Sequence, residues 1–342
     1  MIEQSAKLQN QDFVTYPPAI FLMGPTASGK SSVALEIAKY LPVEIISVDS
    51  AQVYRHMNIG TAKPDVKSMR AVPHHLINLL EPQQRYSAAQ FRGDALAAMG
   101  TITERGNIPL LVGGTMLYFR ALLEGLSELP SADADIRMAI ETRAEANGWP
   151  AMHKELQRLD PPTAARIQPT DSQRIQRALE VCYLTNMPMS EILKNPRHSN
   201  LPYRVISIAL IPRDREVLHQ RIAHRFDDML RLGLIDEVRA IRDKFCLNSE
   251  SPSMRCVGYR QVWMYLNGEA GLEKMREMAL AATRQLAKRQ LTWLRPMKEV
   301  KEFDCLAENL LGQVREHLLE TDLQVRLAQN PSGSPSINGR FG

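Results

Sequence analysis

The sequence lacks the features of secreted, membrane-spanning and zinc-binding proteins. No apolar run approaches the length of a membrane helix, and no signal-peptide core stands near the N-terminus. Cysteines are few, with no C-x-x-C pair and no His/Cys spacing typical of a zinc site. They are Cys182, Cys246, Cys256 and Cys305. We therefore expect a cytoplasmic protein with reduced thiols and no membrane contact.

A strong imbalance of charge is also absent. The formal net charge of +4 does not by itself indicate a nucleic-acid partner, so the positions of the basic residues matter more. Hydrophobic residues make up 44% of the 342 residues and charged residues 23%, which is typical of a globular chain long enough for two domains.

The most informative segment that is present is GPTASGKS at residues 24–31. An apolar run at residues 19–23 precedes it and a helical pattern follows, which is the order of a phosphate-binding loop. Backbone N–H groups of such a loop surround a polyphosphate, Lys30 supplies a positive charge, and Ser31 can offer its hydroxyl to Mg²⁺. A turn that only resembles the motif is the alternative.

Apolar runs alternate with helical patterns along much of the chain. We predict strands at residues 19–23, 43–50, 108–115 and 205–212, with a further short strand considered at 75–80. This order predicts an α/β fold with a phosphate-loop NTPase-like parallel sheet core, whose ligands collect at the carboxyl ends of the strands. By that rule residues 24–31, Asp49 and the turn from Gly113 to Thr115 converge on one crevice.

One stretch interrupts this core. Residues 127–201 contain no strand-like run but two helix starts, with Ser131 and either Thr170 or Asp171 as N-caps. We interpret the stretch as an inserted all-helical domain. The predicted organisation is a flexible N-terminus at 1–18, a catalytic core at 19–126 and 202–320, the insertion at 127–201, and a disordered tail at 326–342.

Asp49 ends a predicted buried strand and admits two interpretations. As a structural residue it would cap the turn that begins with Asp-Ser. As a functional residue it would stand near the phosphates, where it could hold the hydration shell of Mg²⁺ or accept a proton from a nucleophile. Gln52 and Tyr54 follow closely, and the Gln52 amide could bond an amide-like or nucleobase edge.

Several basic clusters could contact phosphates, and a solvated face is the alternative interpretation of such clusters. Arg221 and Arg225 lie four residues apart in a helical pattern, where a guanidinium could bind phosphate oxygens bidentately. Arg284, Lys288 and Arg295 fall on one side of a long predicted helix and form a basic ridge. Two further clusters are QRIQR at 173–177 and RCVGYR at 255–260, the latter with Tyr259 available for stacking on a base. Together they favour an RNA-facing surface.

Six ordered blocks then identify a family. GPTASGKS, VDSAQVYRHMNIGTAKP, LLVGGTMLYFRALLEGL, QRIQRALEV, RCVGYRQVW and TRQLAKRQLTWLR, spread over most of residues 19–296, resemble the bacterial tRNA dimethylallyltransferase family. The resemblance implies transfer of a dimethylallyl group from dimethylallyl diphosphate to N6 of the adenosine 3′ of the anticodon, tRNA position 37. It also implies Mg²⁺ as cofactor and tRNA as partner, with the insertion gripping the anticodon arm. We expect a monomer.

The resemblance further implies roles for matching positions. Asp49 would be the general base, acting with Thr26 and Arg225 as catalytic residues, and Ser31 would bind the metal. The donor diphosphate, or a nucleotide such as ATP in competition with it, would be held by Gly24, Pro25, Thr26, Ala27, Ser28, Gly29, Lys30, Ser31 and Arg225. The tRNA would be contacted by Asp49, Ser50, Ala51, Gln52, Thr115, Arg137, Gln173, Arg174, Ile175, Gln176, Arg177, Arg255, Cys256, Val257, Gly258, Tyr259, Arg260, Lys288, Arg289, Gln290, Leu291, Thr292, Trp293, Leu294 and Arg295.

Two other functions share the phosphate loop. A small-molecule or nucleotide kinase would transfer phosphoryl groups from ATP, but it leaves the basic ridge and RCVGYR unexplained. A nucleotide-switched RNA-binding protein is the second, and its GTPase form is weakened because the sequence has no N-K-x-D motif for guanine. Compared with the family pattern, Ser31 replaces a frequent threonine but keeps the hydroxyl, and no zinc finger follows the catalytic part.

Overall fold

The computed structural model describes residues 16–127, 129–194 and 201–321. The chain divides into two compact units, one formed by residues 1–119 and 202–342 and the other by residues 120–201. The division falls inside helix α4 (Met116–Glu124), whereas the sequence placed the boundary at residue 127. Most of the N-terminus expected to be flexible, and the tail at 326–342, lie outside the described residues, but Pro18 already belongs to the first strand.

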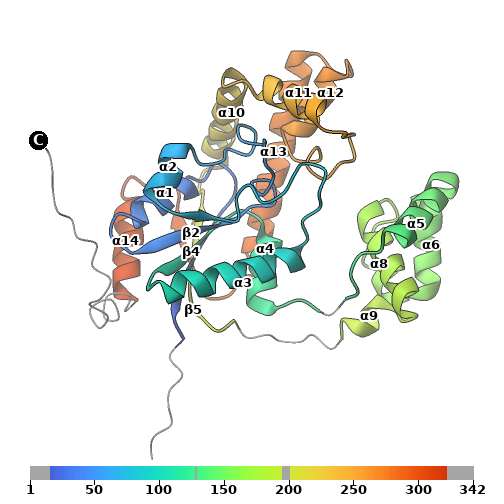
Figure 1. Cartoon of the computed structure of the whole chain (residues 1–342), viewed down its shortest axis with the longest axis horizontal. Coiled ribbons are helices and arrows are strands. Elements are labelled where there is room, and N and C mark those ends of the chain that lie inside the picture. Colours follow the sequence, from blue (N-terminus) through green and yellow to red (C-terminus); the bar gives the residue numbers. More distant parts are fainter. Residues whose placement is uncertain (1–15, 128, 195–200, 322–342) are drawn as a thin grey trace, which may run out of the picture. The chain divides into compact units, whose positions relative to one another are not determined.

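The first unit contains a six-stranded parallel sheet with the order β3-β2-β4-β1-β5-β6 (Figure 1). The strands are β1 (Pro18–Met23), β2 (Val43–Val48), β3 (His74–His75), β4 (Ile108–Gly113), β5 (Arg204–Ile211) and β6 (Val300–Asp304). The four long strands predicted from apolar runs are confirmed, as is the α/β class. The expected strand at 75–80 is reduced to the two residues of β3.

Alternating side chains of β1 face two different layers of helices. Ile20 and Leu22 belong to a core with α1 (Lys30–Ile37) and α14 (Leu310–Glu320) on one face of the sheet (Figure 1). On the other face Phe21 meets Phe119 of α4, with ring centroids 5.3 Å apart, and α3 (Ala88–Glu104) packs against β4 and β2. The parallel strands are therefore covered on both faces, as their nearly continuous apolar sequences require.

A second core positions the segment that follows β2. Four helices, α10 (Arg215–Arg231), α11 (Leu234–Lys244), α12 (Tyr259–Leu266) and α13 (Leu272–Leu294), share one cluster of buried apolar residues. Val53, Tyr54 and Met57 belong to the same cluster. The chain that leaves the sheet at Asp49 is thus held against helices from the C-terminal half of the sequence. Helix α3 begins at a capping box formed by Ser87 and Gln90.

The second unit is entirely helical in its described residues. It contains α5 (Ala134–Asn147), α6 (Trp149–Leu159), α7 (Pro161–Ala164), α8 (Ser172–Thr185) and α9 (Met189–Ile192), packed around Ile140, Leu156 and Ile175. The N-cap of α5 is Asp133 rather than the expected Ser131, because the Asp133 carboxylate accepts the Ile136 N–H at 2.9 Å. Asp171 caps α8, as one of the two predicted alternatives.

Neither unit contains a described helix that is both long and apolar enough to cross a membrane. The four cysteines are free thiols, of which Cys182 and Cys305 are buried and Cys246 is exposed.

Candidate active site

Residues 24–31 form a tight loop between β1 and α1. Ala27 has a φ of 63° and Gly29 a φ of 84°, and such positive φ values let the backbone curve tightly within a few residues. Gly24 is required by space, since a Cβ there would lie 2.7 Å from the Leu210 carbonyl oxygen of β5. Lys30 Nζ donates to the Pro25 carbonyl at 2.6 Å and to Ser28 Oγ at 3.3 Å. The loop therefore has the backbone geometry of an anion-binding site, with Lys30 folded across it.

The segments after β1, β2 and β4 meet at one edge of the sheet, as predicted. Ser50 N–H donates to Thr115 Oγ1 at 3.1 Å, and Thr115 N–H donates to the Val48 carbonyl at 3.2 Å. Gly113 permits this approach, because a Cβ there would lie only 2.0 Å from the Val48 oxygen. The carboxyl ends of parallel strands thus bring Asp49 and Thr115 next to the phosphate loop.

Asp49 has the turn-capping role that its position suggested. Its Oδ1 accepts the N–H groups of Ala51 at 2.8 Å and Gln52 at 3.4 Å, which is the turn-capping role. Within the described residues no group donates to Oδ2, which leaves that oxygen for an external partner. The turn fixes the carboxylate in place without consuming its capacity to accept a proton.

Two cations lie beside this carboxylate without an ion-pair partner among the described residues. Burial lowers the pKa of Lys30 to about 7, and the nearby Arg225 of α10 lowers it as well, while Asp49 acts in the opposite direction. Burial also lowers the pKa of Arg225 below its usual value, again against the attraction of Asp49. Lys30 and Arg225 repel each other in a site of low solvation, so a bound polyanion would relieve both costs.

Two tyrosine hydroxyls and one thiol near Asp49 stay neutral at physiological pH. Burial raises the pKa of Tyr54 to about 12, and burial together with the negative charge of Asp49 raises the pKa of Cys256 to about 12. Burial also raises the pKa of Tyr118, whose ring stacks on Phe91 with centroids 4.2 Å apart. These groups therefore stay protonated and do not compete with Asp49 as proton acceptors.

The Gln52 amide, expected near a nucleobase edge, is engaged by its own segment in this structure. Its Oε1 accepts the Ser47 hydroxyl at 2.8 Å, and its Nε2 lies 3.3 Å from the Thr61 carbonyl, to which it donates. Both ends of the amide therefore hold the segment after β2 against its own strand. Sequence reasoning could not distinguish these uses, because each requires the same polar residue close to Asp49.

Tyr259, predicted to be available for stacking on a base, is not accessible in this structure. Tyr259 is 0% exposed, and its hydroxyl donates to Glu237 Oε1 at 2.5 Å. The same carboxylate accepts the N–H groups of Asn58, Ile59 and Gly60 at 2.8 to 3.3 Å. The sequence reasoning missed Glu237, which stands in the first turn of α11 and has no local signal for this role. Together Glu237 and Tyr259 hold the loop that follows Asp49.

Replacing Gly60 by alanine should therefore destabilise the protein. A Cβ at Gly60 would lie 2.4 Å from Tyr259 Cε2, so the free energy of unfolding should fall by about 1 to 3 kcal/mol through overpacking. Thermal and urea unfolding would measure the change. The matched control is Gly100→Ala in α3, where a Cβ meets nothing within 4 Å and should stabilise the helix by about 1 kcal/mol. Equal stability of the two variants would contradict the packing argument.

In the helical unit, two of the predicted tRNA-binding arginines are engaged internally. Arg137 donates twice to Glu180, at 2.8 and 3.0 Å, and Arg177 donates to the same carboxylate at 2.6 Å. Glu180 is 0% exposed, and Ile175 is equally buried, so neither faces solvent. Gln173 and Arg174 remain exposed on α8. Residues 173–177 lie on a helix, so their side chains point in different directions around its axis. Five consecutive residues therefore cannot all face the same partner.

The basic ridge on α13 is present. Arg284, Lys288 and Arg295 are exposed and form no ion pair with any described residue. Leu294 is buried, so this residue of the predicted contact stretch packs inside. Gln290 also points inward: its Oε1 accepts the Thr26 N–H at 2.8 Å and its Nε2 donates to the Gly114 carbonyl at 3.0 Å. It belongs to the phosphate loop rather than to the outer surface.

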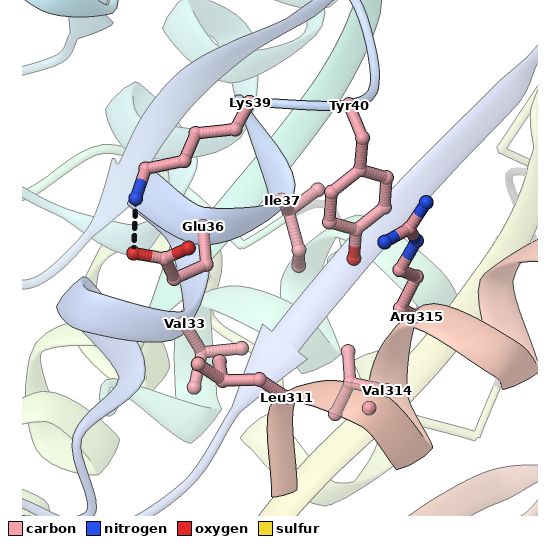
Figure 2. Close-up of a pocket in the computed structure, with 9 residues that line it drawn as sticks. Val33, Glu36, Ile37, Lys39, Tyr40, Leu311, Val314 and Arg315 are labelled. Atoms are coloured by element: carbon pink, nitrogen blue, oxygen red, sulfur yellow. Dashed lines mark hydrogen bonds and ion pairs between the residues drawn. The ribbon is translucent and has the colours of Figure 1, made fainter.

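A separate pocket lies between α1 and α14, toward the end of α1 remote from Lys30 (Figure 2). The Arg315 guanidinium carbon lies 5.4 Å from the centroid of the Tyr40 ring, and Lys39 pairs with Glu36 at 2.6 Å. Charged groups in this pocket are thus already paired or placed over a ring. The pocket shares no residue with the site at Lys30, Asp49 and Arg225.

Comparison with known proteins gives the family. The IPP transferase model matches residues 52–297, and the isopentenyl transferase model matches residues 18–78. A tRNA dimethylallyltransferase from Nitrosospira multiformis is 70% identical over 309 residues, covering 90% of this chain and 96% of that protein. A second one, from Nitrosomonas eutropha, is 63% identical over 298 residues, or 87% and 94% of the two chains.

The fold comparison agrees. The crystal structure of the full-length tRNA isopentenylpyrophosphate transferase from Bacillus halodurans has a TM-score of 0.66 at 35% identity, covering 91% of this chain and 99% of that one. A eukaryotic dimethylallyltransferase described as acting on tRNA has a TM-score of 0.76 at 26% identity, with coverages of 91% and 80%. The resemblance inferred from the six sequence blocks is confirmed, and the chain belongs to the IPP transferase family.

Proposed function

We propose that this protein transfers the dimethylallyl group of dimethylallyl diphosphate to N6 of adenosine 37 in tRNA. The observation that carries the proposal is the juxtaposition of two ion-pair-free cations, Lys30 and Arg225, with the Asp49 carboxylate at the edge of the sheet. Two half-buried cations suit a leaving diphosphate, and a carboxylate beside them suits a nucleophile that must lose a proton. The tRNA substrate places the reaction in the bacterial cytoplasm.

The diphosphate would be held from two sides. Backbone N–H groups of the loop other than that of Thr26, which donates to Gln290, would contact it together with the Lys30 ammonium. The Thr26 hydroxyl would lie beside them, and Arg225 would contact the diphosphate from α10. An allylic diphosphate ionises readily because the developing cation is delocalised, so stabilising the departing oxygens lowers most of the barrier. The two cations contribute more here than in water because the site is poorly solvated.

Mg²⁺ fits this arrangement as a partner of the diphosphate. No three His, Cys, Asp or Glu side chains in the described part of the chain group closely enough to hold an ion by themselves. Ser31 stands in the first turn of α1 beside Lys30, exposed, so its hydroxyl can supply one oxygen ligand. When bound, the ion would neutralise charge on the leaving oxygens. ATP could occupy the same loop in competition with the donor.

Asp49 would accept the proton of the adenine amine. Adenine N6 is a weak nucleophile and becomes acidic only as its bond to carbon forms, so the proton is transferred late in the step. The turn around Oδ1 holds the carboxylate still, and Oδ2, to which no described residue donates, would accept the proton. The neighbouring Tyr54, Tyr118 and Cys256 exclude water, which is the competing nucleophile. An adenosine must leave the base stack to reach such a site.

The basic ridge of α13 would bind the tRNA backbone. The helical unit would grip the anticodon arm through its exposed polar residues, such as Gln173 and Arg174. Arg137 and Arg177 would support that surface from within through Glu180, unless tRNA binding releases them.

Substituting ridge residues should mainly weaken tRNA binding. Lys288→Ala and Arg295→Ala should each remove about one phosphate contact and make the salt slope of log K shallower by about one unit. Affinity for tRNA would be measured at several salt concentrations. Turnover at saturating tRNA should stay near normal in both variants. Lys274→Ala on the same helix is the control, because Lys274 already pairs with Glu277 at 3.2 Å. An unchanged salt slope in both ridge variants would contradict the assignment.

One assay separates this function from the two alternatives. The protein would be incubated with undermodified tRNA and isotopically labelled dimethylallyl diphosphate, with and without ATP. Label that enters the tRNA without ATP supports the transferase. Turnover of ATP with a small acceptor, and no transfer of label, would support a kinase, while nucleotide-dependent tRNA binding without either reaction would support a switch protein. Nuclease digestion of labelled tRNA would locate the modified adenosine.

A further inference from the structure

One side chain joins the helix that carries the basic ridge to the phosphate loop. Gln290 of α13 accepts the Thr26 N–H at 2.8 Å and donates to the Gly114 carbonyl at 3.0 Å. Its amide thereby links the loop after β1 with the turn after β4 and anchors both to α13. We propose that Gln290 is a positioning residue that couples tRNA binding on α13 to the shape, and hence the diphosphate affinity, of the phosphate loop.

Among the described residues, Gln290 is the hydrogen-bond partner of the Thr26 N–H. The residues on either side of Thr26 are held in other ways. The Pro25 carbonyl accepts a hydrogen bond from Lys30 Nζ, and Ala27 has a φ of 63°. Thr26 is half-buried, so an N–H that lost its partner there would carry a desolvation cost of about 1 to 3 kcal/mol. A shift of Gln290 therefore obliges the loop to move with it.

The opposite side of α13 at this level is the exposed one. Lys288 and Thr292 are exposed and lie one turn apart, and Gln290 is about 200° around the helix axis from each of them. A phosphate backbone bound to the exposed side can thus change the position or the mobility of the helix. The Gln290 amide on the opposite side transmits that change to Thr26. Thr115, next to Gly114, accepts a hydrogen bond from the Ser50 N–H through its hydroxyl oxygen. A shift of the turn at Gly114 would therefore also move the turn that holds Asp49.

This coupling rests on the proposed function, because it assumes tRNA on α13 and a diphosphate in the loop. It is reciprocal by thermodynamic linkage: tRNA should raise the affinity for diphosphate by the same factor by which diphosphate raises the affinity for tRNA. Such a device would make the enzyme hold its reactive donor most tightly when the acceptor is present, which limits loss of the donor to water.

Two variants break the linkage at different points. Gln290→Met keeps the length of the side chain but removes both hydrogen bonds. Gly114→Ala leaves the Gln290 residue unchanged. The new Cβ at position 114 would lie 2.3 Å from Gln290 Nε2, so it would displace the Gln290 amide from the loop. Gln285→Met, at an exposed position of the same helix, is the matched control. Thermal unfolding would show that each variant is folded.

The experiment measures binding of inorganic pyrophosphate with Mg²⁺ by calorimetry, with and without an unmodified tRNA transcript. In the wild type and in Gln285→Met, tRNA should tighten pyrophosphate binding by about five-fold or more, within the usual range of coupling. In Gln290→Met and Gly114→Ala the ratio should fall below about twofold, while tRNA affinity without pyrophosphate changes little. A purely structural role would weaken pyrophosphate binding equally in both conditions and leave the ratio unchanged.

The proposal is overturned if the ratio persists in both variants, or if the wild type shows no coupling. Failure of the proposed function is a different result, because it appears as wild-type protein that transfers no label from dimethylallyl diphosphate to tRNA. If Gln290→Met does not fold, Gly114→Ala alone decides the outcome.

Discussion

Replacing Asp49 by asparagine should lower kcat for dimethylallyl transfer by about 10² to 10⁴, the usual contribution of a general base. Asparagine keeps an Oδ1 that can accept the Ala51 and Gln52 N–H groups, so the turn after β2 should survive. What it loses is the capacity to accept the proton of the adenine amine. Affinity for tRNA should therefore change by less than about threefold, since only transition-state stabilisation is removed.

Single-turnover kinetics and tRNA binding would be measured on the same preparations. Asp49→Ala is the informative companion, because it removes the turn as well as the base and should lower stability in addition to turnover. Asp65→Asn controls for loss of one negative charge, since Asp65 caps α2 (Val66–Ala71) at an exposed position and its Oδ1 acceptor is preserved. Equal losses of kcat and of tRNA affinity in Asp49→Asn would contradict the role of Asp49 as base.

Much of this site could be predicted because local sequence determines it. The strands β1, β2 and β4 are continuous apolar runs that end in polar residues, and parallel order brings those ends together. Asp49, Thr115 and Lys30 are therefore placed by the pattern of the chain alone. The glycines at 24 and 113 are likewise required by close contacts between neighbouring strands.

The features that sequence could not supply depend on contacts between distant residues. Gln290 and Thr26 are 264 positions apart, and nothing in the segment around Gln290 distinguishes an inward amide from the exposed basic residues beside it. From the sequence Tyr259 is available for stacking, but in the structure its ring packs closely against Gly60 and its hydroxyl donates to Glu237. Both partners come from other segments of the chain. The strand β6 was missed because an edge strand with the sequence VKEFD lacks a sustained apolar run.

Loss of the Lys30 charge should have opposite effects on function and stability. Lys30→Met should weaken binding of pyrophosphate by about 100-fold, since a charge-assisted contact is removed. The same change removes a buried cation that has no carboxylate partner among the described residues, so the donor-free protein should melt about 3 to 6 °C higher at pH 6. Lys39→Met, which affects an exposed lysine paired with Glu36, should change neither property.

The pH dependence gives this prediction a sign. The folded pKa of Lys30 is lowered to about 7 from 10.5, so between these values the unfolded chain binds more protons than the donor-free folded protein. The cost of burying the charge is therefore full below pH 7 and declines as the pH rises toward 10.5. The difference in melting temperature between Lys30→Met and wild type should accordingly be largest near pH 6 and shrink by pH 9.

Diphosphate binding should show the reverse dependence, because the anion requires the charged form of Lys30. Above pH 7 the wild type should take up close to one proton when pyrophosphate binds, and its affinity should fall as the pH rises. Calorimetry in buffers of different ionisation enthalpy would count that proton, and Lys30→Met should take up none. A wild-type affinity that stays constant from pH 6 to pH 9 would mean that Lys30 is already held charged in the free protein. In that case relief of the poor solvation and mutual repulsion of the Lys30 and Arg225 charges would not be the source of diphosphate binding.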